Sequence, residues 1–256
     1  MEGNLKPLKR LDQVLVERGL MPSRSRAADA ISRGTVLVKG LPAIKPSQKV
    51  QEDWLVEIHD PADGFVSRAA LKLVAAMETF EFDAFGRHAL DIGASTGGFS
   101  QVLLEAGAAH VFAVDVGHDQ LHPLLSQHQN FTHHEGLNIR AIEAHHVSLS
   151  GNPPFIDAIV CDVSFISLKL ALPKALSFAQ SGTWAAILIK PQFEVGKDLL
   201  GKGGIVREEG LAERTAQSIV DWMNAIPGWD VVGLEPSPIA GGSGNKEFIM
   251  GAQFHG

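Results

Sequence analysis

Two charged residues follow two apolar segments of this 256-residue chain. Asp162 comes directly after residues 155–161, and Lys190 comes directly after residues 184–189. Continuous apolar runs of this length are typical of strands buried on both faces of a parallel sheet. If the two strands are neighbours, they lie about 4.8 Å apart and the two side chains meet above one edge of the sheet. Either charge alone is typical of a strand end that emerges into water, whereas the pair beside a ligand-binding turn indicates a reactive site.

Such a turn is present earlier in the chain. The apolar segment 88–92 breaks at Gly93, and small residues continue to Gly97 and Gly98 before a helical pattern begins. In open α/β sheets, ligands bind at turns of this kind, at the carboxyl ends of the strands. The next apolar segment ends in Asp115, about 20 residues beyond the turn, where an acid can hold the hydroxyl pair of a ribose.

The turn favours an adenosine ligand that lacks phosphates. A dinucleotide site needs G-x-G-x-x-G so that the backbone can approach a pyrophosphate, but Ser95 takes the place of the second glycine. S-adenosylmethionine therefore suits the turn better than NAD does, and a tight turn without a ligand is the simpler alternative. The expected cofactor contacts are Asp91, Gly93, Ala94, Ser95, Thr96, Gly97, Phe99, Asp115 and, just past the third strand, Asn138.

The elements that must position these residues alternate between strand and helix from residue 67 to residue 256. A helix is expected at 68–78, strands follow from residue 88, and further helices are expected at 119–127, 167–178 and 208–225. This alternation predicts an α/β fold with a mostly parallel sheet that is covered on both faces. The remaining expected strands are 131–137, 229–234 and 247–254.

Residues 1–60 follow a different pattern, with two short amphipathic helices, at 10–18 and from Ser23 to Arg33, before strands at 35–40 and 54–58. This part carries a net charge of +2, whereas the remainder carries −9. The N-terminal part is therefore the candidate for a polyanionic partner. Residues 61–66 are interpreted as a linker, which gives domains at 1–60 and 67–256.

Composition and motif spacing exclude several other kinds of site and protein. The single cysteine, Cys161, excludes an intrachain disulfide and a cysteine-based zinc site, and no apolar run reaches 18 residues. Seven of the eleven histidines lie between His118 and His146 without zinc-site spacing. Residues 196–202 resemble a phosphate-binding loop, but Gly203 replaces the required Ser or Thr, so a mobile lid or an RNA-contact loop is favoured. A cytoplasmic protein without a metal is expected.

Three motifs in residues 1–60 resemble an S4 RNA-binding domain: RLDQVLVERGL at 10–20, SRSRA at 23–27 and GTVLVKG at 34–40. The resemblance implies a small α+β domain that contacts RNA through its second helix and the loop that follows. The residues implied in RNA binding are Arg10, Arg24, Arg26, Arg33, Lys39 and Lys45.

Motifs in the remainder resemble the TlyA (hemolysin A-like) family, in which an S4 domain is fused to an FtsJ-like ribose 2′-O-methyltransferase. They are DIGASTGGF at 91–99, CDVSFIS at 161–167 and KPQFE at 190–194. The resemblance implies a Rossmann-like class I methyltransferase sheet, S-adenosylmethionine as methyl donor and cytidines of 16S or 23S ribosomal RNA as substrates. It also implies a Lys-Asp-Lys-Glu catalytic set, which falls on Lys72, Asp162, Lys190 and Glu247.

The chemistry of ribose methylation agrees with these residue types. A ribose 2′-hydroxyl is a poor nucleophile, so it must be held in line with the methyl group and must lose its proton. We expect Lys190 to accept the proton, Lys72 to steer the hydroxyl, and Asp162 and Glu247 to position the two lysines. Two alternatives stay open: an S4-type RNA-binding assembly factor without catalysis, and, less favoured for lack of a membrane-spanning segment, a pore-forming hemolysin.

Overall fold

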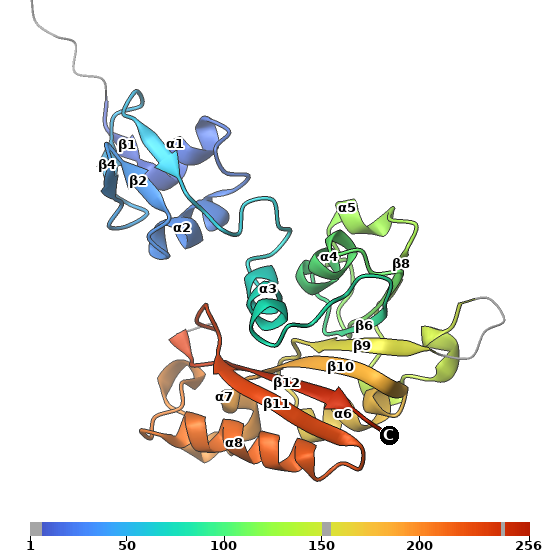
Figure 1. Ribbon diagram of the computed structural model, residues 1–256. Helices are drawn as coiled ribbons and strands as arrows, with labels where there is room; N and C mark the ends of the chain where they lie inside the picture. Colours follow the sequence, from blue (N-terminus) through green and yellow to red (C-terminus); the bar gives the residue numbers. More distant parts are fainter. Residues whose placement is uncertain (1–6, 150–154, 242–243) are drawn as a thin grey trace, which may run out of the picture. The chain divides into compact units, whose positions relative to one another are not determined.

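The computed structural model describes residues 7–149, 155–241 and 244–256 and divides the chain into two compact units (Figure 1). The first unit ends at Asp63 and the second begins at Gly64. This division falls inside the segment 61–66 that the sequence suggests as a linker. Residues 1–6 of the expected first domain lie outside the described residues.

The first unit packs two helices against small sheets. Its core is formed by apolar side chains of the two helices and of the strands, with Leu11, Leu15 and Val36 fully buried. Ser23 caps the second helix as expected, because its hydroxyl accepts a hydrogen bond from the Arg26 amide. The elements are β1 (Lys9–Arg10), α1 (Leu11–Glu17), α2 (Arg24–Ser32), β2 (Val36–Val38), β3 (Leu41–Pro42), β4 (Lys49–Val50) and β5 (Val56–Ile58).

The second unit is built on a seven-stranded sheet with the strand order β11-β12-β10-β9-β6-β7-β8. The five strands from β10 to β8 are parallel, and β12 runs antiparallel to both β10 and β11. The strands are β6 (His88–Ile92), β7 (His110–Val114), β8 (Phe131–His134), β9 (Ile156–Cys161), β10 (Ala179–Ile189), β11 (Trp229–Pro236) and β12 (Phe248–Phe254). The predicted α/β fold with a mostly parallel sheet is confirmed.

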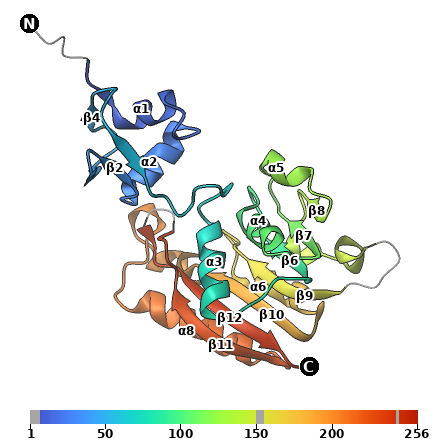
Figure 2. The same ribbon diagram turned by 45° about the horizontal axis from the view of Figure 1, so that its top comes forward.

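Helices cover both faces of this sheet (Figures 1 and 2). One apolar core lies under α3 and α4 and includes Leu73, Leu103 and Trp184; the other lies under α6 and α8 and includes Leu172 and Ile219. The α-helices are α3 (Ala70–Thr79), α4 (Gly98–Glu105), α5 (Pro123–Ser126), α6 (Leu168–Leu176), α7 (Pro191–Glu194) and α8 (Leu211–Asn224). Short 3-10 turns are η1 (Ile139–Ala141), η2 (Ala144–Val147), η3 (Lys197–Leu199) and η4 (Lys202–Gly204).

The helix expected at 119–127 is much shorter than the sequence suggests. Asp119 adopts a positive φ of 56°, which a right-handed helix does not allow, and the helix begins only at Pro123. Proline restricts the residue before it to extended conformations, so His122 becomes the N-cap rather than a helical residue. The expected strand 131–137 likewise ends at His134, before Gly136 with its φ of 65°.

The strand register brings the candidate residues to one edge. β9 and β10 are parallel neighbours with Cys161 opposite Ile187, so Asp162 and Lys190 emerge at the same end. On the other side of β10, Ile189 pairs with Phe248, which places Glu247 next to Lys190 along the antiparallel pair. The two strands that precede Asp162 and Lys190 are therefore neighbours, as their pairing requires, and the last strand brings Glu247 to the same edge.

Candidate active site

Four charged side chains form a continuous chain at this edge of the sheet. Lys190 Nζ lies 2.6 Å from Asp162 Oδ1, and Lys72 Nζ lies 3.8 Å from Asp162 Oδ2. Lys72 Nζ also donates a hydrogen bond of 2.6 Å to Glu247 Oε2. The four side chains are between 3% and 14% exposed. Two ammonium groups and two carboxylates sum to zero charge, as burial of ionised groups requires.

Lys72 reaches this group because α3 packs closely on the sheet and on α4. A β-carbon at Gly98, the first residue of α4, would lie 2.9 Å from the Ser67 β-carbon, so glycine permits the segment before α3 to approach. Lys72 lies in the first turn of α3, and only 7% of the residue is exposed. Its neighbours on the helix are small or apolar, so the ammonium extends toward the two carboxylates.

Two cavities adjoin the charged group. The larger has a volume of about 730 Å³ and lies above the ends of β6, β7 and β9. The smaller has a volume of about 190 Å³ and is lined by Ser67, Phe99 and Lys190 among others. Gly93, Ser95, Asp162 and Ser164 line both cavities, so the cavities meet at these residues. The charged group is therefore adjacent to the junction of two ligand-sized spaces.

The wall of the larger cavity suits a ribose and an adenine ring. Asp115 Oδ2 accepts a hydrogen bond from the Ser95 amide and Oδ1 accepts one from the Gly117 amide, both at 2.7 Å. These bonds fix the carboxylate at the cavity, where its remaining lone pairs can accept ribose hydroxyls. Ser95 itself has a positive φ of 47°. A β-carbon at Gly93 would lie 3.0 Å from the Asp162 carbonyl oxygen, so the turn needs glycine at this position.

The other predicted cofactor contacts divide into two groups. Ala94, Thr96 and Phe99 line the smaller cavity, and Asn138 lines the larger one. Asp91 and Gly97 line neither cavity. Asp91 and Gly97 belong to the strand and turn that form this edge, but the direct cofactor contact expected from the sequence is not visible for them in either cavity.

Asp91 is fully buried, and its Oδ2 accepts a 2.6 Å hydrogen bond from the Ser100 hydroxyl on α4. Burial raises the pKa of this carboxyl to about 7, against the opposing effect of the hydrogen bond. Cys161 is also buried, and burial raises the pKa of its thiol to about 12, so it is not a nucleophile at neutral pH. Both groups are thus enclosed at the ends of neighbouring strands, and the cofactor contact expected for Asp91 stays a prediction.

Several residues at the cavities were not predicted from the sequence, and three of them show what was missed. Ser164 accepts a hydrogen bond of 2.9 Å from Lys190 Nζ, Gln120 Oε1 accepts one of 3.0 Å from the Ser95 hydroxyl, and Val116 lines the larger cavity. Val116 directly follows the ribose acid, and this adjacency is a signal that could have identified it. Ser164 lies inside the CDVSFIS motif at 161–167, which is a second such signal, whereas Gln120 lies in a loop without a pattern that would distinguish it from other polar loop residues.

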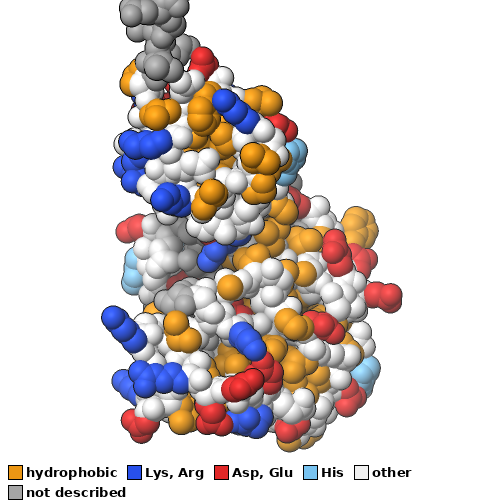
Figure 3. All heavy atoms as spheres, turned by 90° about the vertical axis from the view of Figure 1, so that its left-hand side faces the viewer, with side chains coloured by type: hydrophobic (Ala, Val, Ile, Leu, Met, Phe, Trp, Pro, Cys, Tyr) orange, Lys and Arg blue, Asp and Glu red, His pale blue; other side chains and the backbone are white. Residues whose placement is uncertain are grey.

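The candidate RNA-binding residues of the first unit are in different surroundings. Arg10 and Arg24 both donate to Asp12, and the Arg10 hydrogen bond lowers the pKa of that carboxyl to about 2. Lys39 Nζ lies 3.8 Å from the centre of the Trp54 ring. Lys45 is exposed, and Arg26 is half-buried on α2. Lys and Arg side chains lie among apolar side chains on the surface of this unit (Figure 3).

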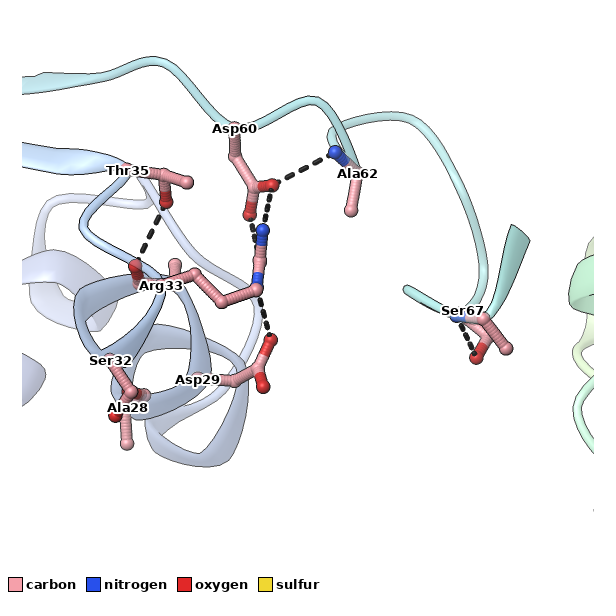
Figure 4. Close-up of polar contacts among 10 residues, drawn as sticks. Ala28, Asp29, Ser32, Arg33, Thr35, Asp60, Ala62 and Ser67 are labelled. Carbon is pink, nitrogen blue, oxygen red and sulfur yellow. Dashed lines mark hydrogen bonds and ion pairs between the residues drawn. The ribbon is translucent and has the colours of Figure 1, made fainter. Parts of the chain in front are cut away.

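Arg33 is held by carboxylates rather than directed to solvent (Figure 4). Its Nε donates to Asp29 Oδ2 at 2.9 Å, and its two terminal nitrogens donate to the two oxygens of Asp60 at 2.6 Å each. Only 16% of its side chain is exposed, against 6% for Asp60. Asp60 Oδ1 also accepts from the Ala62 amide at 2.8 Å, so Arg33 fastens the last residues of the first unit to α2.

Within the described residues, we find no helix that combines the length and the apolar character needed to span a membrane. Two family descriptions match the chain: the S4 domain at residues 9–53 and the FtsJ-like methyltransferase at residues 65–254.

Three similar proteins cover nearly the whole chain. The 16S/23S rRNA (cytidine-2′-O)-methyltransferase TlyA of Mycobacterium tuberculosis strain H37Rv is 41% identical over 94% of this chain and 88% of its own length. Hemolysin A of Brachyspira hyodysenteriae is 35% identical over 94% of this chain and 98% of its own length. A solved structure from Streptococcus thermophilus, described as a candidate hemolysin, is 35% identical over 97% of this chain and 89% of its own, with a TM-score of 0.71.

An S4 domain and an FtsJ-like methyltransferase domain are thus matched along one chain, with relatives above 30% identity over most of its length. S-adenosylmethionine is the methyl donor of such enzymes, and the cavity beside Asp115 has the groups to hold its adenosine. The protein belongs to the TlyA/hemolysin A family of S4-domain, FtsJ-like, S-adenosylmethionine-dependent methyltransferases.

Proposed function

We propose that this protein methylates the 2′-hydroxyl of cytidine ribose in 16S or 23S ribosomal RNA, acting on ribosomal subunits in the cytoplasm. The observation that carries the proposal is the buried set of Lys72, Asp162, Lys190 and Glu247 at the junction of the two cavities. The M. tuberculosis relative bears this activity in its name, at 41% identity over nearly the full chain.

Lys190 has the position of the proton acceptor. It lines the smaller cavity, whereas Lys72 is nearly enclosed by its two carboxylates. Bound S-adenosylmethionine supplies an electrophilic methyl on a sulfonium. As the acceptor oxygen forms its bond to that carbon and the carbon–sulfur bond breaks, Lys190 Nζ takes the hydroxyl proton. General-base assistance of this kind contributes typically about 10²–10⁴-fold to a rate.

The other three residues hold Lys190 and the acceptor in place. Asp162 contacts both ammonium groups, so it fixes their separation. Lys72, held by Glu247, keeps a positive charge in the four-residue set while Lys190 is neutral, and this charge stabilises the negative charge that develops on the acceptor oxygen. Orientation of two reacting groups before the reaction removes several kcal/mol of the barrier, up to about 7–11 kcal/mol in model systems.

The first unit supplies RNA affinity in this proposal. Arg24, Lys39 and Lys45 are exposed cations on it, and such groups contact phosphates without reading sequence. Arg33 is assigned a structural role instead, because both sides of its guanidinium group are already occupied by carboxylates.

The proposal is tested by transfer of a labelled methyl from S-adenosylmethionine to separated 30S and 50S subunits that lack the modification. Wild type, Lys190→Ala and the control Lys174→Ala are compared; Lys174 is exposed on α6 and lines neither cavity. We expect ribose-methylated cytidine from wild type and from Lys174→Ala, and a loss of about 10²–10⁴-fold for Lys190→Ala.

Two results would contradict the proposal. Equal rates for wild type and Lys190→Ala would remove the base assignment. Absence of transfer to both subunits, with cofactor binding intact, would favour another RNA substrate or an assembly factor that uses the S4 domain without catalysis. A liposome-leakage assay on the same preparation addresses the hemolysin name that some relatives carry.

A further inference from the structure

The Lys190 amine has one hydrogen-bond acceptor and one ion-pair partner besides any substrate. Nζ lies 2.6 Å from Asp162 Oδ1 and donates a 2.9 Å hydrogen bond to Ser164 Oγ. Among the described residues, these two are the partners found for this nitrogen. Ser164 is exposed and lines both cavities, so its hydroxyl lies at the junction where the methyl acceptor must arrive.

The loop that carries Ser164 is fastened at both ends to the segment that carries Lys190. At its start, Asp162 is bound to Lys190. At its end, Glu194 accepts hydrogen bonds from the Ser167 hydroxyl at 2.6 Å and from the Leu168 amide at 2.8 Å. Ser164 therefore has a place set by the fold, and it is not a freely moving loop residue.

The middle of the loop is shaped by Phe165. This residue has a φ of 65°, which is uncommon for a residue other than glycine, and its ring contacts the Phe193 ring with 4.9 Å between centroids. Backbone strain of this kind persists only where the contacts around the residue hold it in place, and it occurs preferentially at functional sites. The strained residue directly follows Ser164.

The number of hydrogens on an amine gives this contact a chemical consequence. A lysine that is ready to accept a proton is neutral, with two N–H bonds and one lone pair. One N–H bond is directed to Ser164, and a second hydrogen rather than the lone pair faces the nearby Asp162 carboxylate, because two sources of negative charge repel each other. The lone pair is then left in the third position about Nζ. Without Ser164, the amine can rotate about its Cε–Nζ bond and place a hydrogen where the lone pair is needed.

We propose that Ser164 is a positioning residue that, together with Asp162, directs the lone pair of Lys190 toward the ribose 2′-hydroxyl. This inference rests on the proposed 2′-O-methylation and adds a fifth residue to the four-residue set. Ser164 acts through Lys190: it accepts one N–H and leaves the proton transfer to the amine.

The test uses three substitutions of one residue. Ser164→Thr keeps the hydroxyl group. Ser164→Val has the shape of the threonine variant but lacks the hydroxyl, and Ser164→Ala removes the hydroxyl without adding any atoms. Because Ser164 is exposed, an added methyl group has space. The measurements are the single-turnover rate of methyl transfer to unmodified subunits and the Kd for S-adenosylmethionine.

We expect Ser164→Ala and Ser164→Val to transfer methyl about 10–100-fold more slowly than wild type, since misorientation of a reacting group has effects of this size. Ser164→Thr should stay within about 3-fold of wild type, and the Kd values set the cofactor concentration that saturates each variant, so that the rates compare the transfer step alone. In a Lys190→Ala background, the Ser164→Ala change should have no further effect, because the residue acts through the missing amine.

Three outcomes would overturn the inference: a wild-type rate for Ser164→Val, a Ser164→Thr rate as low as that of Ser164→Val, or an undiminished Ser164→Ala effect in the Lys190→Ala background. If wild type itself transfers no methyl to either subunit, the proposed function fails, and that result is distinct from each of these. The Lys190→Ala background also separates a local role from a general loss of folding, which would persist there.

Discussion

Lys72 and Glu247 are 175 residues apart in the chain, yet Lys72 Nζ donates a 2.6 Å hydrogen bond to Glu247 Oε2 beneath the surface. The contact joins a helix at the start of the second unit to the beginning of its last strand. Both side chains are less than one-tenth exposed, so each ionised group depends on the other for compensation.

Removing one member of this pair should therefore cost more stability than removing both. We expect Lys72→Met or Glu247→Leu alone to lower the free energy of unfolding by about 3–5 kcal/mol, and the double variant to recover much of that loss. Methyl transfer should be lost in all three variants. Urea unfolding measures the energies, and additive losses in the double variant would contradict the interpretation.

Asp162 is expected to matter for rate rather than for cofactor affinity. Asp162→Asn keeps the shape but removes the charge that lies between Lys190 and Lys72. We predict a fall in the single-turnover rate of about 10²–10⁴-fold, the scale of a lost acid–base arrangement. Asp230→Asn, an exposed acid on β11, is the control. A rate within 3-fold of wild type would remove Asp162 from the mechanism.

Cofactor affinity should instead depend on Asp115. In Asp115→Asn an amide replaces the carboxylate whose oxygens accept the Ser95 and Gly117 amides. Hydrogen bonds to charged groups contribute about 1.5–3 kcal/mol, so we expect the Kd for S-adenosylmethionine to rise about 10–100-fold by calorimetry. The matched control is Asp119→Asn, an exposed residue whose positive φ asparagine accepts readily. Equal Kd values for the two variants would contradict this role.

Arg33 and Lys45 should separate stability from RNA affinity. Arg33→Met removes the guanidinium group that binds Asp29 and Asp60, and we expect the first unit to lose about 2–4 kcal/mol of stability. Lys45→Met should change stability by less than about 0.5 kcal/mol, yet reduce the salt dependence of RNA binding. Thermal unfolding and binding titrations at several salt concentrations provide the measurements. If Arg33→Met is as stable as wild type but binds RNA more weakly, the structural role is contradicted and Arg33 is an RNA-binding residue.

The buried Asp91 predicts a dependence of stability on pH. Its pKa is raised from 3.8 to about 7 in the folded protein, because burial disfavours the charged form. The folded state therefore holds a proton that the unfolded state releases, so this contribution is fully present below pH 3.8 and is lost as the pH rises to about 7.

Asp91→Asn removes this titration while its amide oxygen can still accept from Ser100. Relative to wild type, the variant should gain roughly 2–4 kcal/mol between pH 4 and pH 8. Urea midpoints at several pH values measure the difference. A difference that does not change with pH would show that Asp91 is not the group responsible.

The sequence predicted the parts of the site that depend on strand ends. Asp162 and Lys190 could be paired from their positions after apolar runs, because parallel neighbouring strands end at one edge. Lys72 and Glu247 followed only from the resemblance to a known family, since no spacing relates a helical lysine to an acid 175 residues away. The contact between Lys72 and Glu247 depends on how α3 packs on the sheet, and local sequence patterns do not predict that packing.

Arg33 shows a property that its type and position in the sequence did not predict, namely its ion-pair partners. Its position on a helix with other arginines suggested RNA binding, but one of its acids, Asp60, is 27 residues away and the other is one helical turn back. Charge type alone does not reveal whether a partner comes from elsewhere in the fold. The helix expected at 119–127 is present only from Pro123 to Ser126, and its predicted start was wrong for a local reason, because the positive φ of Asp119 does not fit a helix.

The position of β12 has a consequence for synthesis on the ribosome. The strand lies between β10 and β11, both of which precede it in the chain, and Glu247 stands just before it. A nascent chain that has already formed β10 and β11 must keep a gap between them, or separate them again, before β12 can enter. Until then Lys72 has no Glu247 to bind. If the four-residue set carries the reaction as proposed, the chain becomes competent for methyl transfer only when β12 has entered the sheet.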